Sequence, residues 1–333
     1  MYRVYVTRQM KIDAVKYLKR LDKEGITASL KKMRDGLKPV ESLNNLDDYK
    51  NYLTDIIKYY PLIQIMPLNF FERFMSHHPN ITKLSGADLK KEFYSTGKSK
   101  KSFSKMIISR MRYSDDAKGL SAKNLIAPFL KNYGFNVCVY CNQSLIHYDP
   151  KGIIDRGSLD HFYNKDRYPF LCTSFFNFVP CCGECNGRRR KGERRIGFMS
   201  YREDESIKGS PFKFTFDINA FGKFCYENDV NLDFLEDPDM GDLDTLETYN
   251  EVFKISSDYQ SYKYMVCDVI NDEFFQSIEQ NNTAEAVSNG RLKPDTGRVR
   301  NILRVYSLDE KDIHKRQYMK LLLDLGKHLK WIP

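Results

Sequence analysis

The sequence lacks several features that would each place the chain in a particular class of protein. No apolar run approaches the length of a membrane-spanning helix, and the opening segment MYRVYVTRQMKIDAVKYLKR is charged along its length, unlike a secretory signal. The nucleotide-binding pattern G-x-x-x-x-G-K-[ST] is missing, so any use of a nucleotide would belong to a partner. With 12 prolines and 18 glycines in 333 residues, and no internal repeat, the chain is not of low complexity. We therefore expect a globular, cytoplasmic protein without a membrane role.

The composition leaves a broad set of functions open. With 333 residues, of which 41% are hydrophobic, the chain is long enough for two or three domains with substantial cores. Its net charge of +9 favours a polyanionic partner such as nucleic acid, but a soluble basic protein without such a partner has the same charge. Charge alone therefore does not separate these two classes.

Eight cysteines are present, and in a cytoplasmic protein paired cysteines indicate a metal site more often than disulfides. Four of them form two C-x-x-C pairs, Cys138 with Cys141 and Cys182 with Cys185. Two such pairs with a segment between them are typical of a tetrahedral zinc site. Cys181 competes with Cys182, but only Cys182 has the C-x-x-C spacing to Cys185. The remaining cysteines are isolated and are expected to be buried, inert thiols: Cys172, Cys225 and Cys267.

Further polar residues accompany the two cysteine pairs. Asp160 and His161 lie between the pairs, Asn177 precedes the second pair and Asn186 follows it directly. A zinc ribbon needs only the four thiolates, so these additions indicate chemistry beyond metal-stabilised folding. A basic run comes next: Arg188, Arg189, Arg190, Lys191, Arg194 and Arg195.

This arrangement resembles the HNH endonucleases, which are built on the ββα-metal motif. Those proteins have a C-x-x-C pair, an Asp-His pair, an Asn or His, a second C-x-x-C pair and then a His or Asn, in the order found here. The last position here is Asn186, so the chain resembles an H-N-N variant, and Asn164 stands where many members have proline. The resemblance covers about the central fifth of the chain. It implies two strands and a helix folded around one divalent metal ion.

The resemblance also implies a role for each of these residues. Asp160 and Asn186 would hold a catalytic Mg²⁺ or Mn²⁺, because such ions prefer oxygen ligands. His161 would take a proton from the attacking water, and Asn177 would brace the loop that orients it. A Zn²⁺ ion on the four cysteines would be structural, because four thiolates leave no open position. Contacts to flanking phosphates would come from the first part of the basic run: Arg188, Arg189, Arg190 and Lys191.

These roles predict a metal-dependent endonuclease that hydrolyses phosphodiesters and leaves 5′-phosphate and 3′-hydroxyl ends, with DNA as the default substrate. RNA, including tRNA, stays open as the substrate, since one metal ion and one histidine can attack either backbone. A non-catalytic zinc module that binds nucleic acid or protein is the alternative from another class. The layout is similar to that of HNH subunits in Septu-like and retron-linked anti-phage systems of bacteria, which implies an antiviral role and an ATPase partner.

The expected fold class is α+β and mostly helical, with a central zinc-stabilised ββα-metal module. We expect an N-terminal helical domain over residues 1–130, the HNH module over 131–200 and a mostly helical C-terminal domain over 201–333. Alternating apolar residues in Phe212–Ile218 predict a strand. Apolar spacing predicts helices over 11–37 with a break at Gly25, from 46 onwards, and over 106–112, 125–130, 246–275, 299–306 and 309–330.

Two charged stretches allow more than one interpretation. Residues 98–105 (KSKKSFSK) could contact phosphate or form a solvated loop. Residues 231–247 are rich in aspartate and glutamate but lack the calcium-loop pattern. We expect this acidic stretch to be a solvated surface that repels nucleic acid and suits a protein partner.

Overall fold

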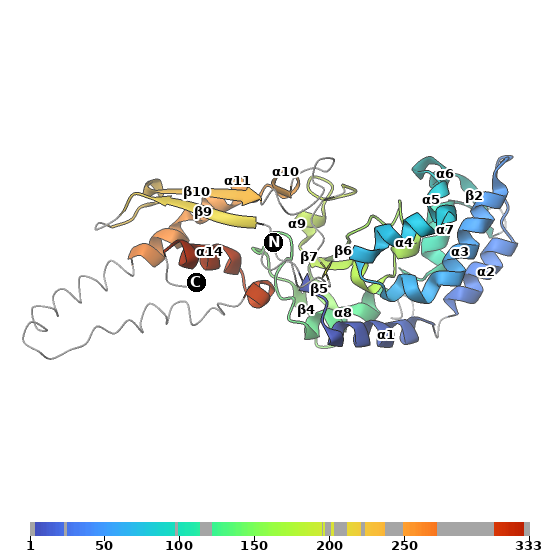
Figure 1. Cartoon of the computed structure of the whole chain (residues 1–333), viewed down its shortest axis with the longest axis horizontal. Helices are drawn as coiled ribbons and strands as arrows, with labels where there is room; N and C mark the ends of the chain where they lie inside the picture. The colour runs from blue at the N-terminus through green and yellow to red at the C-terminus, as the bar shows by residue number, and fades with distance from the viewer. Residues whose placement is uncertain are drawn as a thin grey trace, which may run out of the picture.

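The computed structural model describes residues 4–22, 25–96, 99–113, 122–194, 196, 201–202, 212–220, 224–236, 249–271 and 310–329. Over these residues the protein is mainly helical, with small two-stranded sheets, so the expected α+β, mostly helical class is confirmed at this level. Figure 1 shows an elongated molecule with the N-terminal helices at one end and β9, β10 and α14 at the other. The short strands β4 to β7 and helix α9 lie between these two ends.

The N-terminal region is an assembly of helices in which α3 packs against both α1 and α2. α1 buries Tyr17, Leu18 and Leu21 on one face, and Gly25 separates α1 from α2 at the predicted break. Gly25 has a φ of 66°, a left-handed conformation that glycine adopts without strain. The helices predicted over 11–37, from 46 onwards, over 106–112 and over 125–130 are present, whereas the short helices between residues 68 and 90 were not predicted. The bounds are α1 Arg8–Asp22, α2 Ile26–Asp35, α3 Leu46–Ile65, η1 Leu68–Phe70, α4 Phe71–His77, α5 Pro79–Lys83, α6 Gly86–Lys90, α7 Phe103–Arg110 and α8 Ala122–Asn132.

The basic stretch 98–105 is ordered secondary structure over its described part. β2 (Glu92–Thr96) and β3 (Ser99–Ser102) form an antiparallel hairpin. α7 begins directly after β3, where the Ser102 hydroxyl accepts the backbone N–H of Lys105 and caps the helix. The alternative of a solvated loop is therefore wrong for residues 99–105, although the lysine side chains of β3 are exposed.

The central region has little regular structure. Its strands are β4 His147–Tyr148, β5 Ile154–Arg156, β6 Ser158–His161 and β7 Phe178–Cys181, with the turns η3 Pro169–Leu171 and η4 Phe175–Asn177 before β7 and the short helix α9 Gly183–Asn186 after it. β6 pairs antiparallel with β7, and His161 lies opposite Phe178 in the register. The order strand, strand, helix places His161 at the end of β6 and Asn186 at the end of α9.

The C-terminal region contains the predicted strand, β9 (Phe212–Ile218), which pairs antiparallel with β10 (Val230–Glu236). β10 occupies the start of the acidic stretch, with Leu232 and Phe234 buried and Asp233 exposed. The expectation of a solvated surface is therefore wrong for one face of this segment, since β10 contributes to the core; residues 237–247 lie outside the described residues. The helical elements are η5 Glu227–Asp229, α10 Tyr249–Phe253, α11 Ile255–Tyr259, η6 Gln260–Tyr262, a helix over 263–271, η7 Glu310–Lys315 and α14 Met319–His328.

The single helix predicted over 309–330 is divided into η7 and α14 by Tyr318, whose φ is 56°. The helix predicted over 299–306 lies outside the described residues. A further short pairing joins β1 (Val4–Tyr5) in parallel to β8 (Tyr201–Arg202).

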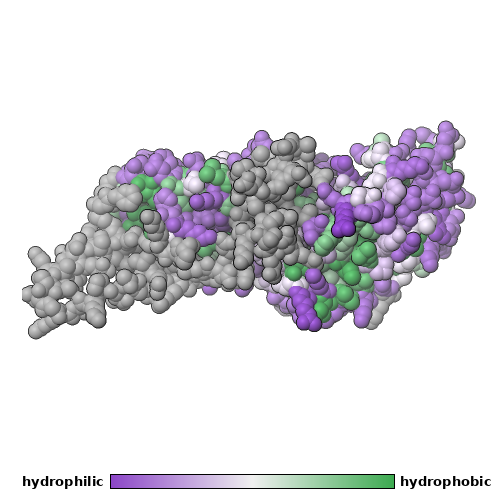
Figure 2. Space-filling view, in the orientation of Figure 1, coloured by the Kyte–Doolittle hydropathy of each residue, from purple (hydrophilic) through white to green (hydrophobic). Residues whose placement is uncertain are grey.

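One large apolar cluster runs through the N-terminal, central and C-terminal regions, from Val4 to Leu325. In Figure 2 the surface over the N-terminal helices is mostly hydrophilic, with an apolar area near α1 and α8. Ile12 and Val15 on α1 are 43% and 39% exposed. Among the described residues, no helix combines the length and the apolar character needed to cross a membrane.

Candidate metal centre and reaction site

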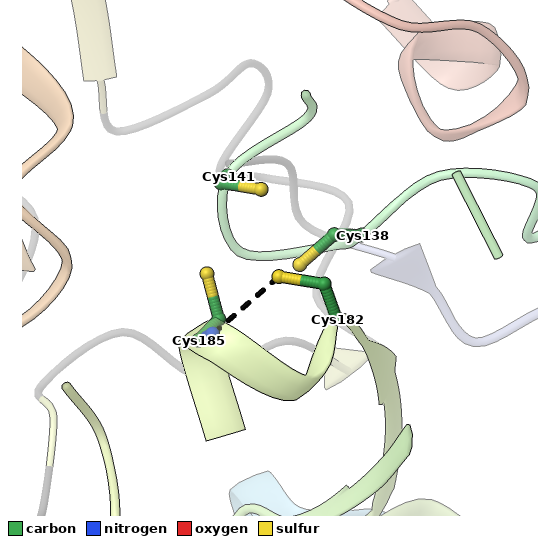
Figure 3. A group of neighbouring side chains, drawn as sticks. All are labelled: Cys138, Cys141, Cys182 and Cys185. Atoms are coloured by element: carbon green, nitrogen blue, oxygen red, sulfur yellow. Dashed lines mark hydrogen bonds between the residues drawn. The ribbon is translucent and has the colours of Figure 1, made fainter. Parts of the chain in front are cut away.

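The structure brings the four predicted cysteines together. Their sulfur atoms all lie within 4.8 Å of one another, and all four residues are buried. Cys138 and Cys141 come from the loop before β4, whereas Cys182 and Cys185 come from the start of α9, and the four side chains converge in Figure 3. A buried group of four thiols at this separation can hold one metal ion, and thiolate ligands suit zinc.

The local structure around Cys182 favours the thiolate, which is the form of cysteine that binds a metal ion. Cys182 is the N-cap of α9, and its sulfur accepts the backbone N–H of Cys185 at 3.4 Å (Figure 3). Hydrogen bonds from the neighbouring thiols and from this N–H lower the pKa of Cys182 well below its usual range. Cys181 is the last residue of β7, and its sulfur contacts the Ser158 carbonyl instead of the cluster. The assignment of Cys182 over Cys181 therefore agrees with the structure.

The loop that carries Cys138 and Cys141 is held by the C-terminal region. Asn142 has a φ of 57°, and its amide donates to the Ile313 carbonyl at 2.7 Å while its Oδ1 accepts the backbone N–H of Lys320 at 3.1 Å. The Tyr249 hydroxyl donates to the Tyr140 carbonyl at 2.6 Å. We call this set of contacts the C-terminal clamp: Tyr249, Tyr259, Ile313, Tyr318 and Lys320 against residues 140–142.

Asp160 lies next to this loop and is almost completely buried. Its Oδ2 accepts the Tyr140 hydroxyl at 2.6 Å and the Lys191 ammonium at 2.9 Å. Burial raises the pKa of Asp160, while Lys191 and Tyr140 oppose that rise. The Lys191 ammonium also donates to the carbonyl of His161 at 3.0 Å, so Lys191 holds both residues of the Asp-His pair.

His161 is buried between two aromatic rings. The centroid of its ring lies 4.8 Å from that of Tyr113 and 5.1 Å from that of Phe178. Its Nε2 lies 2.9 Å from the carbonyl oxygen of Cys172. Burial lowers the pKa of His161 to about 3, and the positive charges of Lys165 and Lys191 act in the same direction. The imidazole is therefore neutral at pH 7.

Asn177 braces the long connection between β6 and β7, which is the place that the resemblance implies for it. Its Oδ1 accepts the backbone N–H of Tyr163 at 2.8 Å, and its Nδ2 donates to the carbonyls of Tyr163 and Leu171 at 3.1 and 3.0 Å. Asn164 stands where many HNH nucleases have proline, and it turns the chain through hydrogen bonds of its side chain. Its Oδ1 accepts the backbone N–H groups two and three residues later.

Asn186 makes a single side-chain hydrogen bond among the described residues. Its Nδ2 donates to the Ser158 hydroxyl at 2.7 Å. Ser158 and Asp160 alternate on β6 and therefore share one face of the strand. Asn186 thus reaches the side of β6 that carries Asp160.

The basic run divides into exposed and buried members. Arg188 and Arg189 are exposed, as a phosphate-contacting role requires. Arg190 is half-buried, because its guanidinium pairs with Asp258 at 2.8 Å and with Glu184 at 2.7 Å. The surface position expected for Lys191 is wrong, since its side chain is 0% exposed and bound to Asp160. Arg195 lies outside the described residues.

Several residues at this site were not identified by the sequence analysis. Tyr140 and Ser158 contact Asp160 and Asn186 through side chains that nothing in the sequence marks as polar partners. Lys165 contributes positive charge near His161.

Two of the isolated thiols are not isolated in space. Cys225 and Cys267 lie 3.4 Å apart, sulfur to sulfur, and both are buried. Cys225 is also joined to Asn271 by two hydrogen bonds that use its backbone N–H and carbonyl. Cys172 is buried as expected.

Comparison with known proteins identified no matching protein family, no similar curated protein and no similar solved structure. The resemblance to HNH endonucleases therefore rests on the motif residues alone.

Proposed function

We propose that the protein is a metal-dependent endonuclease of the HNH kind, which hydrolyses phosphodiester bonds in nucleic acid. The state of His161 at the end of β6 carries this proposal. A carbonyl oxygen can only accept a hydrogen bond, so the contact with Cys172 puts the proton on Nε2 and leaves the lone pair on Nδ1. A neutral imidazole with its lone pair fixed on Nδ1 has the protonation state in which a histidine can accept a proton from an attacking water.

Asp160 and Asn186 have the donor atoms that a magnesium or manganese ion requires. Asp160 uses Oδ2 for both of its side-chain contacts, and Asn186 donates from Nδ2. The carboxylate of Asp160 and the amide oxygen of Asn186 are donors of the kind that such a cation prefers. When bound, such an ion would neutralise the scissile phosphate and stabilise the leaving 3′ oxygen.

A zinc ion on the four cysteines would serve the fold and not the reaction, because four thiolates close its coordination sphere. It would fix the loop 138–141 against the start of α9. That loop carries Tyr140, whose hydroxyl bonds to Asp160, so the zinc ion would hold Asp160 in place through one intervening side chain.

The substrate that fits best is nucleic acid, with DNA favoured by the resemblance and RNA or tRNA as the second candidate. Arg188 and Arg189 are exposed beside α9, and Lys165 adds positive charge near His161. A phosphate backbone that reached His161 would meet these charges. Action in anti-phage defence, in the cytoplasm and with an ATPase partner, is the biological setting that the same resemblance implies.

The direct test is incubation of purified protein with supercoiled plasmid, single-stranded DNA and RNA, with and without Mg²⁺. His161→Ala should lower the cleavage rate by about 10²–10⁴-fold, the usual contribution of a general base, while zinc content and substrate binding persist. His147→Ala is the matched control, because His147 is an exposed histidine of the same region.

Asn186→Ala separates the role of the metal ion from that of the base. It should also lose cleavage, but excess Mg²⁺ or Mn²⁺ should restore part of the activity, since only a ligand is missing. His161→Ala should not respond to added metal, although imidazole in solution could replace the base. Cleavage by His161→Ala at the wild-type rate would overturn the proposal and favour a non-catalytic zinc module.

A further inference from the structure

Four consecutive backbone carbonyls, Phe170 to Thr173, each accept a hydrogen bond from a different side chain. We call residues 170–173 the carbonyl segment. The donors are Gln64 to Phe170 at 3.3 Å, Asn177 to Leu171 at 3.0 Å, His161 to Cys172 at 2.9 Å and Tyr17 to Thr173 at 2.7 Å. Two donors come from the central region, and the other two come from helices α1 and α3 of the N-terminal region.

The side-chain amide of Gln64, on α3, has a fixed orientation. The Thr173 hydroxyl donates to Oε1 of Gln64 at 2.7 Å, so the amide of Gln64 must point its Nε2 toward the Phe170 carbonyl. Gln64, Thr173 and Tyr17 are all 0% exposed. Buried polar groups are costly to leave without partners, so these contacts hold the carbonyl segment in one position.

His161 depends on this segment for the position of its proton. β6 places the backbone of His161, but the oxygen that its Nε2 meets belongs to Cys172, between the residues that Gln64 and Tyr17 hold. If the Cys172 carbonyl moved away, the proton could reside on either ring nitrogen. The lone pair would then no longer be confined to Nδ1.

We infer that Tyr17 and Gln64 are positioning residues for His161, which act through the Cys172 carbonyl to select the imidazole tautomer. The N-terminal helices are thereby part of the reaction centre, although the residues that touch substrate lie elsewhere. This inference rests on the proposed function, because it takes His161 to be the base.

The test uses three variants of the full chain. Tyr17→Phe removes one hydroxyl and keeps the ring that packs 5.5 Å from Phe175, and Gln64→Met removes the amide at similar length. The double variant Tyr17→Phe/Gln64→Met removes both donors. Tyr49→Phe is the matched control, since it deletes a hydroxyl that donates to the Asp88 carbonyl, in the same region but away from the carbonyl segment.

Two measurements are made on each protein. Long-range ¹H–¹⁵N NMR of ¹⁵N-histidine-labelled protein reports the tautomer of His161, identified by the signal that disappears in His161→Ala. The wild type and Tyr49→Phe should show a neutral ring protonated on Nε2, and the double variant should show mixed tautomers. Cleavage kinetics should give a kcat at least about tenfold lower in the double variant with KM within about twofold, because a misplaced base loses rate and not affinity.

An unchanged tautomer and an unchanged kcat in the folded double variant would overturn the inference. If the double variant does not fold, Tyr17→Phe alone decides, since the loss of a single oxygen atom should still shift the tautomer ratio measurably. If the wild type cleaves no nucleic acid, the proposed function fails. The NMR measurement then still decides whether the N-terminal helices set the tautomer.

Discussion

The replacement of Lys191 by methionine tests the buried ion pair between Lys191 and Asp160 directly. Methionine keeps most of the length and the apolar stem of lysine but removes the ammonium that bonds to Asp160 and to the His161 carbonyl. Both partners are desolvated, with side-chain exposures of 0% for Lys191 and 5% for Asp160. The carboxylate left behind has two options, either to stay charged without its cation or to take up a proton.

The free-energy cost of each option can be estimated. An unpaired charge left in the interior costs about 3–5 kcal/mol. Protonation at pH 7 of a carboxyl with an unfolded pKa of about 3.9 spans about three pKa units at about 1.36 kcal/mol each, or about 4 kcal/mol. The less costly option sets the loss, so Lys191→Met should reduce the free energy of unfolding by about 3–4 kcal/mol at pH 7.

The loss should depend on pH with a definite sign. In the variant the folded-state pKa of Asp160 rises further above its unfolded value, because Lys191 no longer opposes the effect of burial and only the Tyr140 hydroxyl and the backbone N–H of His161 still do. The folded variant then holds a proton that the unfolded chain releases above about pH 4, so its deficit relative to wild type grows as the pH rises, by up to about 1.4 kcal/mol per unit. The deficit should be small near pH 4 and largest near pH 7.

Urea unfolding of the zinc-containing protein at pH 5, 6 and 7, without added Mg²⁺, measures this effect. The double variant Lys191→Met/Asp160→Asn should recover most of the lost stability, because no charge remains to be buried. Arg189→Met on the exposed part of the basic run should change stability by less than about 0.5 kcal/mol. A deficit below about 1 kcal/mol at pH 7, typical of an exposed pair, would refute the buried ion pair.

Three further outcomes are expected. Elemental analysis should find about one zinc per chain, and Cys185→Ser should yield insoluble protein, because metal binding and folding are coupled in such sites. The double variant Arg188→Ala/Arg189→Ala should lower the slope of log Kd against log salt for nucleic acid by about two, and an unchanged slope would remove both residues from the interface. Treatment with diamide should join Cys225 to Cys267, with loss of two hydrogen atoms detected by peptide mass spectrometry, whereas separate thiols after treatment would contradict their 3.4 Å separation.

Local patterns predicted the parts of the site that depend on short spacing. The C-x-x-C pairs specified a four-cysteine cluster because each pair is held by its own turn, and the alternation of Phe212–Ile218 specified a strand. The longer helices before residue 132 were predictable because each buries one regularly spaced face, whereas the short helices between residues 68 and 90 were not predicted.

The rest of the site depends on contacts between segments that are distant in the sequence. Lys191 stands in a run of arginines typical of a solvated surface, and only the position of Asp160 makes it a buried partner. Gln64 and Tyr17 are ordinary residues of amphipathic helices until residues 170–173 pack against them. The type of a residue does not show which distant residue it will contact. Every residue has a backbone carbonyl, so the sequence cannot show that the carbonyl of Cys172 accepts a hydrogen bond from His161.

The C-terminal clamp has a consequence for the biosynthesis of this protein. Asn142, which follows the first cysteine pair, is held by Ile313, a residue made 171 positions later. Both cysteine pairs therefore leave the ribosome before the segment that holds residues 140–142, and the hydroxyl of Tyr140 in this loop bonds to Asp160. A growing chain has its four cysteines, Asp160 and His161 before it has the C-terminal contacts that hold Tyr140. Under the proposed function, cleavage of nucleic acid would begin only after translation has passed residue 320.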